Sequence, residues 1–385
     1  MKILLITSRN AYSTSGELRL IKNRAKTLSE VYGVQTDVIV FRHKKTLKKA
    51  QEKLNCGEFI IKTYSWISYL FVKNKLKNLI KKEIGRKKYR VVVLSGVVVF
   101  PLISYLKPLF PNVKFIADIH GAYEELIEFS GRNQIQTYIR RLYYKYAKHE
   151  EQKFLPLYNA YFVVSKALMN YVKKEYSIEN NCFFIVPCAI QETSLDVETV
   201  KKNRIKYRQK YGLKDNDLLF VYSGGVSPWQ CIEKSVEMYK HFSTDKNNTK
   251  LLLMSNNKEY LSKFASDNIL IDSYPAEEVR RVLCACDYAF LLRQDLTTNN
   301  VAYPNKFLEY VSCGLKIITT DYVYDVAEQT KKYKLGICVS LSEMLPDATF
   351  IDNKGFLDDI ERRNTLLKET CFSTTLLPFV KYIQA

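Results

Sequence analysis

Short apolar runs that alternate with longer amphipathic stretches limit most strongly how this chain can fold. In the first half the apolar runs predict strands at 2–8, 34–41, 90–94, 113–119, 160–164 and 181–186, and apolar spacing predicts a helix over 18–32. Further strands are predicted at 217–222, 250–254, 269–271, 288–292, 316–320 and 336–339. The helices expected with them cover 230–242, 258–265, 276–285, 306–313, 326–332, 352–367 and 373–384. Such alternation is typical of α/β proteins and predicts two Rossmann-like, doubly wound domains facing across a cleft and joined near 187–196.

Positive charge is confined to one of these halves. The chain has 385 residues and a formal charge of +19. Residues 1–190 hold 33 Lys and Arg against 14 Asp and Glu, whereas residues 191–385 hold 26 of each sign. The densest stretch, Arg42–Arg90, has 16 basic and 3 acidic residues. We therefore expect the first half to meet an anionic partner.

Several classes of protein are excluded by the same sequence. The longest uncharged run, between Arg90 and Lys107, has 16 residues with Gly96 and Pro101 inside it, and a spanning helix needs about 20. The N-terminus lacks the pattern of a signal peptide. Nine cysteines, without a C-x-x-C pair, indicate reduced thiols rather than a disulfide framework or a zinc site. We therefore expect a cytoplasmic protein without a metal centre.

Doubly wound sheets bind ligands at the carboxyl ends of their strands, so the loops that follow strands are the first candidates for a site. In the first half, the loop 8–17 leads into a helix at Gly16, where free N–H groups could bind an anion. This loop is not G-x-G-x-x-G, which argues against a nicotinamide cofactor, and a plain turn is the alternative. His120 follows the strand 113–119 and could contact a sugar hydroxyl or a phosphate, or act as an acid or base. A structural histidine is the alternative, and Asp118 is interpreted as mainly structural.

The second half offers a glycine-containing loop at the end of its first strand. Ser223, Gly224 and Gly225 would let the backbone approach a phosphate closely, and the helix 230–242 would point its N-terminus at the same place. A turn without a ligand is the alternative.

A second phosphate-binding candidate begins at Pro304, where a helix can start because proline lacks the N–H. Free N–H groups near Asn305 and the charge of Lys306 suit a diphosphate. Glu309 lies one turn later on the same face and could accept hydrogen bonds from a ribose diol. The alternative is a plain Lys–Glu surface pair. Arg293, after the strand 288–292, could reach the diphosphate or pair with Asp295 instead.

These segments together resemble a known family. Residues 304–318, PNKFLEYVSCGLKII, are similar to the P-x-K-x-x-E-Y-x-x-x-G-x-P-V-I segment of GT-B fold group 1 glycosyltransferases, and residues 118–121, DIHG, resemble their D-x-H-G loop. Gly16 and residues 223–225 match the family's two glycine loops, and the order holds along the whole chain. The resemblance implies a GT-B fold with an acceptor-binding domain over 1–188, a nucleotide-sugar domain over 189–366, and a final helix, 367–385, that returns to the first domain.

The resemblance also implies an activity, which is transfer of a sugar from a UDP- or GDP-linked donor without a metal and with retention of configuration. Glu309 would then bind ribose, Lys306 and the Asn305 amide the diphosphate or sugar, His120 the transferred sugar, and Tyr274 the base.

Two departures from the family pattern stand out. Val301 replaces the first acid of the family's E-x7-E pair, which leaves the sugar and the stereochemical outcome open. Residues 227–230 replace an Arg and a Lys in the glycine loop, for which Arg293 could compensate.

The basic segment 65–90 is the candidate for the anionic partner. Its apolar stripe of Val72, Leu76, Leu79, Ile80 and Ile84, bordered by lysines and with Trp66, Tyr69 and Phe71 upstream, suits a helix lying on an anionic membrane. The alternative is an ordinary helix that covers a sheet.

We therefore expect a peripheral enzyme at the inner face of the membrane that uses a lipid-linked or glycan acceptor in bacterial surface or capsular polysaccharide synthesis. The alternatives are a non-catalytic protein that binds nucleic acid or an anionic surface, and another GT-B activity such as sugar epimerisation or polyol-phosphate transfer.

Overall fold

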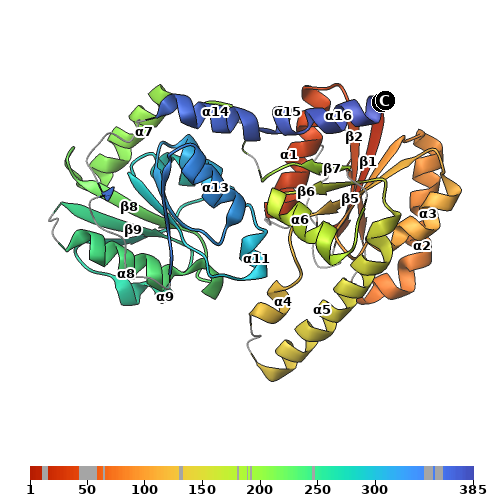
Figure 1. The fold of residues 1–385 in the computed structure, drawn as a ribbon, viewed down its shortest axis with the longest axis horizontal. Helices are drawn as coiled ribbons and strands as arrows, with labels where there is room; N and C mark the ends of the chain where they lie inside the picture. Colours follow the sequence, from red (N-terminus) through yellow and green to blue (C-terminus); the bar gives the residue numbers. More distant parts are fainter. Residues whose placement is uncertain are drawn as a thin grey trace. The chain divides into compact units, whose positions relative to one another are not determined.

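The computed structural model describes most of the chain as two compact units. The described residues are 1–10, 16–42, 59–63, 66–129, 133–179, 182–188, 190, 193–244, 248–341, 350–351 and 359–385, with the backbone alone at 9–10, 16–17, 41–42, 59–63 and 66–76. Unit 1 contains residues 1–191 and 372–385, and unit 2 contains residues 192–371. Figure 1 shows a sheet flanked by helices in each unit.

Unit 1 is built on a parallel sheet. Within its described part, seven strands lie in the order β3-β2-β1-β4-β5-β6-β7, and each neighbouring pair is parallel. The strands are β1 (Lys2–Asn10), β2 (Gln35–Arg42), β3 (Phe59–Thr63), β4 (Val91–Ser95), β5 (Lys114–Ile119), β6 (Ala160–Val163) and β7 (Phe183–Ile185). β4 reads VVVLS and is buried throughout, as expected for a strand covered on both faces. The predicted doubly wound sheet is confirmed, but β3, an edge strand in a polar and basic stretch, was not predicted.

Helices cover this sheet and extend from it. They are α1 (Gly16–Glu30), α2 (Trp66–Lys87), α3 (Ile103–Leu109), α4 (Glu125–Glu128), α5 (Gln134–Phe154) and α6 (Lys166–Glu175). Short 3₁₀ turns precede α3, at Phe100–Leu102, and follow α5, at Leu155–Leu157. The α4–α5 hairpin projects from the sheet of unit 1 (Figure 1).

The apolar stripe of α2 is only partly within the described side chains, and there it faces the core. Ile80 and Ile84 are buried, whereas Lys81 and Lys82 are exposed. Val72, Leu76, Trp66, Tyr69 and Phe71 lie among the residues whose side chains are outside the described set. The described part of α2 therefore behaves as a sheet-covering helix with a solvated lysine face.

The end of the chain packs on unit 1. α15 (Phe372–Thr375) and α16 (Leu377–Gln384) close the chain. Phe379 is buried, with its ring centroid 4.7 Å from that of Phe162 and 5.4 Å from that of Phe184. The Lys114 ammonium donates to the carbonyl of Tyr382 at 2.7 Å. The last helix therefore completes the core beside β6 and β7.

Unit 2 repeats the architecture. Its described strands form a parallel sheet of six in the order β10-β9-β8-β11-β12-β13, namely β8 (Leu218–Ser223), β9 (Thr249–Met254), β10 (Ile269–Asp272), β11 (Tyr288–Leu291), β12 (Lys316–Thr320) and β13 (Gly336–Val339). The helices are α7 (Val197–Lys210), α8 (Ile232–Ser243), α9 (Lys258–Leu261), α10 (Ala276–Leu283), α11 (Thr297–Asn300), α12 (Asn305–Ser312), α13 (Tyr324–Lys332) and α14 (Ile360–Thr370). The helix predicted at 230–242 begins later, because Pro228–Gln230 forms a 3₁₀ turn and Cys231 is left-handed. Of the helix predicted at 352–367, residues 352–358 lie outside the described residues.

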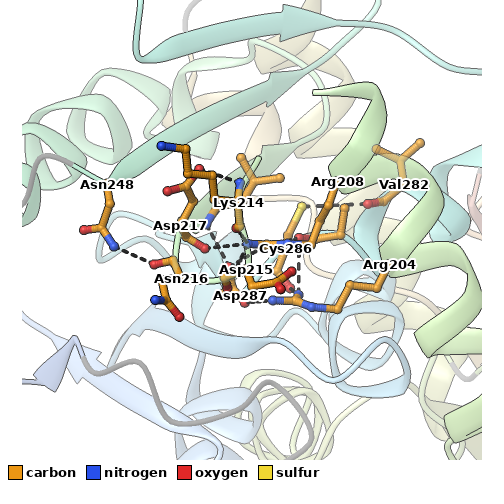
Figure 2. A network of polar contacts seen from close by, with 12 residues as sticks. Arg204, Arg208, Lys214, Asp215, Asn216, Asp217, Asn248, Val282, Cys286 and Asp287 are labelled. Carbon is orange, nitrogen blue, oxygen red and sulfur yellow. Dashed lines mark hydrogen bonds and ion pairs between the residues drawn. The ribbon is translucent and has the colours of Figure 1, made fainter. Parts of the chain in front are cut away.

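A buried ionic network fastens α7 to the sheet of unit 2 (Figure 2). The Asp287 carboxylate accepts hydrogen bonds from Arg204 at 2.6 Å and from Arg208 at 3.3 Å. It also accepts a hydrogen bond from the backbone N–H of Leu219 at 2.8 Å. Arg208 also donates to the carbonyls of Lys214 and Asp217. Each buried charge is hydrogen-bonded, so the network holds the start of β8 in register with the turn before β11.

Candidate active site

In the loop after β8, the backbone of a glycine lies against the ammonium group of a lysine. Ser223 ends the strand, and Gly224 follows with φ of +149°, a conformation that favours glycine. A Cβ built on Gly224 would overlap the Nζ atom of Lys306 and lie 2.9 Å from Oε1 of Gln230. The backbone angle of this position therefore favours glycine, and a side chain there would displace the Lys306 ammonium.

Lys306 is the cation at the centre of this arrangement. Its ammonium donates to Oε1 of Gln230 at 2.6 Å and lies 5.3 Å from the ring centroid of Tyr222. Burial, helped by the neighbouring charge of Arg293, lowers the pKa of Lys306 to about 7, against the opposing effect of Glu309. Among the described residues, the hydrogen-bond partner of this ammonium is the Gln230 amide rather than a carboxylate. A cation in such surroundings is a candidate for binding an anion.

The helix that carries Lys306 begins as the sequence predicts. Pro304 is the N-cap residue of α12, with φ of −66°, and Asn305 is the first helical residue. Phe307 donates its backbone N–H to the carbonyl of Pro304 at 3.1 Å, whereas the N–H groups of Asn305 and Lys306 precede the first carbonyl acceptor of the helix. The helix dipole adds to their attraction for an anion. Glu309 lies one turn further on and is half-buried. Pro304, Asn305, Lys306 and Glu309 are thus together on the first turns of one helix.

Arg293 lies at the end of the neighbouring strand. Its side chain is buried, its Nη1 donates to the carbonyl of Leu292 at 2.7 Å, and its backbone exchanges two hydrogen bonds with the Thr320 hydroxyl. Burial lowers the pKa of Arg293. The alternative partner considered for it, Asp295, accepts from Asn300. Because β8 and β11 are adjacent strands at the point where the strand order reverses, Gly224 and Arg293 follow strands that flank the switch point of the sheet.

Tyr274, the candidate for docking a base, lies in the loop after β10, at the edge of the sheet. Its hydroxyl is 2.6 Å from the Lys210 ammonium and 2.5 Å from the Tyr211 hydroxyl. The Lys210 ammonium lies 4.6 Å from the ring centroid of Tyr274, and Tyr207 contacts this ring edge to face. The ring is therefore held in place by α7 rather than free to rotate.

In unit 1, His120 follows β5 and belongs to a polar cluster at the carboxyl ends of β4 and β5. Its Nε2 is 2.8 Å from Oδ2 of Asp118 and 3.0 Å from the Ser95 hydroxyl, and its side chain is 10% exposed. The imidazole is thus fixed through Nε2, and Nδ1 is left as a buried polar atom without a hydrogen-bond partner among the described residues.

Asp118 holds this cluster together. It is fully buried and accepts from Arg24 at 2.6 Å, and Arg24 also donates to the carbonyl of Val186. Burial alone would raise the pKa of the Asp118 carboxyl, but Arg24 and His120 outweigh it and hold the pKa below its ordinary value. Asp118 is therefore an ionised group that fixes the position of His120.

Two further positions named from the sequence are placed by the fold. Gly16 is the first residue of α1, and residues 11–15 of the loop before it lie outside the described residues. Val301, which occupies the position of the family's first acid, is buried at the end of α11. A carboxylate there would need a buried partner, so the surroundings of this position are adapted to an apolar side chain.

Sequence reasoning missed the residues that position the two candidates. Gln230 was considered only as a replacement for a missing cation, yet it is the hydrogen-bond partner of Lys306. Ser95 and Arg24 contact His120 and Asp118 from 25 and 94 residues away. No local pattern could reveal such pairs, although Ser95 directly follows the predicted strand 90–94 and ends the observed β4.

The described residues contain neither a metal-binding group of side chains nor a membrane-spanning helix. No group of three or more His, Cys, Asp or Glu among them is arranged to hold a metal ion. Across the same part of the chain, every helix is too short or too polar to cross a bilayer.

Comparison with known proteins gives structural matches without sequence matches. No protein-family model and no curated protein matches the sequence. WaaG, a glycosyltransferase involved in lipopolysaccharide biosynthesis, superposes with a TM-score of 0.67 at 14% identity, covering 99% of this chain and 100% of its own. Sucrose-phosphate synthase from Thermosynechococcus elongatus superposes with a TM-score of 0.72 at 13% identity, covering 100% of this chain and 98% of its own. The trehalose-6-phosphate protein of E. coli bound with UDP-2-fluoro glucose superposes with a TM-score of 0.66 at 7% identity, covering 100% of this chain and 99% of its own.

These matches define the class of fold. Two parallel, doubly wound units in one chain, similar over the full length to solved glycosyltransferases, constitute the GT-B fold. The GT-B resemblance indicated by the sequence motifs is confirmed at the level of the fold.

Proposed function

We propose that this protein is a glycosyltransferase that moves a sugar from a nucleotide-sugar donor to an acceptor. The observation that carries the proposal is the poorly solvated Lys306 ammonium, placed against the backbone of Gly224 on the first turn of α12. Three features that attract a diphosphate occur together there, namely a cation, N–H groups at a helix N-terminus and a glycine backbone that a phosphate can approach closely. The glycosyltransferases that share the fold, one of them bound with a UDP-sugar analogue, support this assignment.

In the proposed mechanism, unit 2 holds the donor. The diphosphate replaces Gln230 as the partner of Lys306 and accepts from the N–H groups near Asn305. Glu309 accepts from the ribose diol, and Tyr274 contacts the base. As the sugar–phosphate bond breaks, negative charge grows on the leaving phosphate, and the Lys306 ammonium stabilises it without requiring a metal ion. This pocket is also shaped by Ser223, Gly225, Pro304 and Arg293. The buried Arg293 guanidinium adds positive charge to it.

Unit 1 contributes the groups that meet the sugar and the acceptor. His120, held through Nε2 by Asp118 and Ser95, presents Nδ1 to a hydroxyl of the transferred sugar. Gly16 begins a helix whose N–H groups face the same strand ends. We further propose that configuration is retained, that the donor is a UDP or GDP sugar, and that no other cofactor takes part.

The acceptor proposed is a lipid-linked or glycan molecule of bacterial surface or capsular polysaccharide, met at the inner face of the membrane. The positive charge of residues 1–190, densest over Arg42–Arg90, supports an anionic surface as the partner of unit 1. The exposed Lys81 and Lys82 of α2 belong to this charge. The role of WaaG in lipopolysaccharide synthesis is consistent with such an acceptor.

A thermal-shift screen against UDP- and GDP-sugars, followed by measurement of released nucleoside diphosphate, tests the proposal. A donor at about 100 times its dissociation constant should add about 2.7 kcal/mol of stability. Lys306→Ala and Glu309→Ala should abolish the shift, whereas Lys240→Ala, an exposed lysine on α8, should leave it unchanged. If no nucleotide sugar shifts the wild type and no nucleoside diphosphate is released, the proposal is wrong. RNA binding in the same sample would then favour a non-catalytic protein.

A further inference from the structure

Helix α5 exposes an apolar face that the fold of unit 1 does not use. Ile135, Tyr138, Ile139, Leu142 and Tyr146 are 73%, 63%, 58%, 49% and 42% exposed. Among the side chains described in unit 1, most of the large apolar ones that are exposed lie on this helix and the preceding α4, where Ile127 is 46% exposed. Isolated exposed apolar residues are ordinary, but a contiguous row marks an interaction surface.

The spacing of these residues places them on one side of the helix. Positions 135, 138, 139, 142 and 146 follow the three- and four-residue steps of an α-helical stripe. The opposite side is the one that joins unit 1, because Ala147, Glu151 and Phe154 are buried. α5 therefore has two faces with different tasks, and Figure 1 shows its first turns projecting from the unit.

The exposed face is bordered by positive charge. Arg141 and Lys145 are exposed on the same helix, one turn apart. An open hollow of about 410 Å³ lies beside them, lined by Asn133, Gln134, Thr137, Tyr138 and Arg141. Apolar residues flanked by tyrosines, arginine and lysine are the composition of helices that lie in the interface of an anionic bilayer.

The helix is also rigidly mounted. Lys148 donates to Glu124 at 3.1 Å and to the Tyr171 hydroxyl at 2.8 Å, and the Tyr171 hydroxyl donates to Glu124 at 2.6 Å. Arg140 donates to the carbonyl of Leu126. These contacts join α5 to α4 and α6, so the exposed face is held out as a fixed surface rather than on a loose segment.

We propose that the exposed face of α5 docks unit 1 onto an anionic phospholipid bilayer, with the apolar row in the acyl boundary and Arg141 and Lys145 among the phosphates. This inference rests on the proposed membrane acceptor and moves the apolar contact from α2, where Ile80 and Ile84 are buried and Leu79 is half-buried, to α5. A second copy of the chain fits this face less well than a bilayer does, because a symmetric contact would bring Arg141 and Lys145 of one copy close to the same two cations of the other.

Flotation of the full-length protein with vesicles tests the docking. We expect binding to phosphatidylcholine vesicles containing about one-third phosphatidylglycerol and weak binding to phosphatidylcholine alone. The combined variant Ile135→Ser, Ile139→Ser, Leu142→Ser should lower the partition coefficient at least about tenfold. Arg141→Gln and Lys145→Gln should each lower it about fivefold on the anionic vesicles alone. Ile205→Ser, on α7 of unit 2 and 70% exposed, is the matched control and should bind as the wild type does.

A fluorescent probe reports the contact directly. Tyr138→Trp should show a blue-shifted emission and quenching by brominated lipid when anionic vesicles are added, and Tyr324→Trp, at a position 51% exposed in unit 2, should not. Unchanged flotation of the combined variant, absence of binding by the wild type, or a wild-type dimer that this variant makes monomeric would each overturn the docking proposal. A donor-induced thermal shift that persists in the combined variant would show that such a failure concerns docking and not donor binding.

Discussion

At the scale of single residues, the ionisation of Lys306 predicts how donor binding depends on pH. Its pKa is about 7 in the free protein because burial disfavours the ammonium. A bound diphosphate favours the ammonium and raises this pKa, so binding takes up a proton wherever free Lys306 is neutral. Donor affinity should therefore fall by up to about tenfold per pH unit above about pH 7. Calorimetric titrations between about pH 6.5 and 8.5, in buffers of different ionisation enthalpy, measure both the affinity and the proton uptake.

The matched variant is Lys306→Met, which keeps an unbranched side chain one atom shorter than lysine and removes its charge. It should bind the donor weakly at every pH and without proton uptake. Both phosphates of a nucleotide sugar are diesters that stay ionised over this range, so the ligand contributes no slope of its own. A pH slope that survives in Lys306→Met would assign the titration to another group and contradict the prediction.

Glu151 predicts a pH dependence of stability that is independent of the donor. It is buried on α5, where it accepts from the Tyr176 hydroxyl, and burial raises its pKa to about 7. Because the folded state holds this proton more tightly, the stabilisation is complete below about pH 4.5 and is lost as pH rises through 7, by an amount on the order of 3 kcal/mol. Glu151→Gln should remove that loss, and chemical unfolding followed between about pH 5 and 8 measures it. Glu150→Gln on the same helix should keep the wild-type slope.

At the scale of structural elements, the loop after β8 predicts a difference between two adjacent glycines. Gly224→Ala places a Cβ on the Lys306 ammonium and forces a non-glycine residue to φ of +149°. Donor affinity should fall at least about tenfold, which is about 1.4 kcal/mol. In Gly225→Ala, the Cβ meets only the Gln230 amide, at 3.2 Å, so the effect should be several times smaller. Equal affinities for the two variants would show that the loop does not position Lys306.

The same elements show which features of the fold and of the candidate site can be predicted from the sequence and which cannot. Strands such as β4 are predictable because burial on both faces requires a continuous apolar run. The site on α12 is predictable because proline, lysine and glutamate follow one another on a single helix. The Gln230 bond to Lys306 and the Arg24 bond to Asp118 join distant segments, and only the tertiary fold creates them. For α5 the periodicity is visible, but periodicity does not tell which of two apolar faces the core will cover.

At the scale of the whole molecule, the assignment of the C-terminal helix to unit 1 predicts where a mutation acts. Phe379 follows all of unit 2 in the sequence, yet its ring packs on Phe162 and Phe184 in unit 1. Phe379→Ala should therefore cost about 3–5 kcal/mol of stability in unit 1 by leaving a cavity in its core. Leu367, buried on α14 in unit 2, is the matched position only twelve residues earlier, and Leu367→Ala should weaken unit 2 instead.

Hydrogen exchange followed by mass spectrometry separates the two effects, because each unit has its own core and can open on its own. In Phe379→Ala, exchange should rise in peptides from β5, β6 and β7, while peptides from β8 to β12 keep their wild-type protection. In Leu367→Ala the pattern should be reversed. If Phe379→Ala instead increased exchange equally in both sheets, the units would unfold as one cooperative body. A donor bound to unit 2 would then stabilise unit 1 as well, and a thermal shift could no longer be assigned to the unit that binds the ligand.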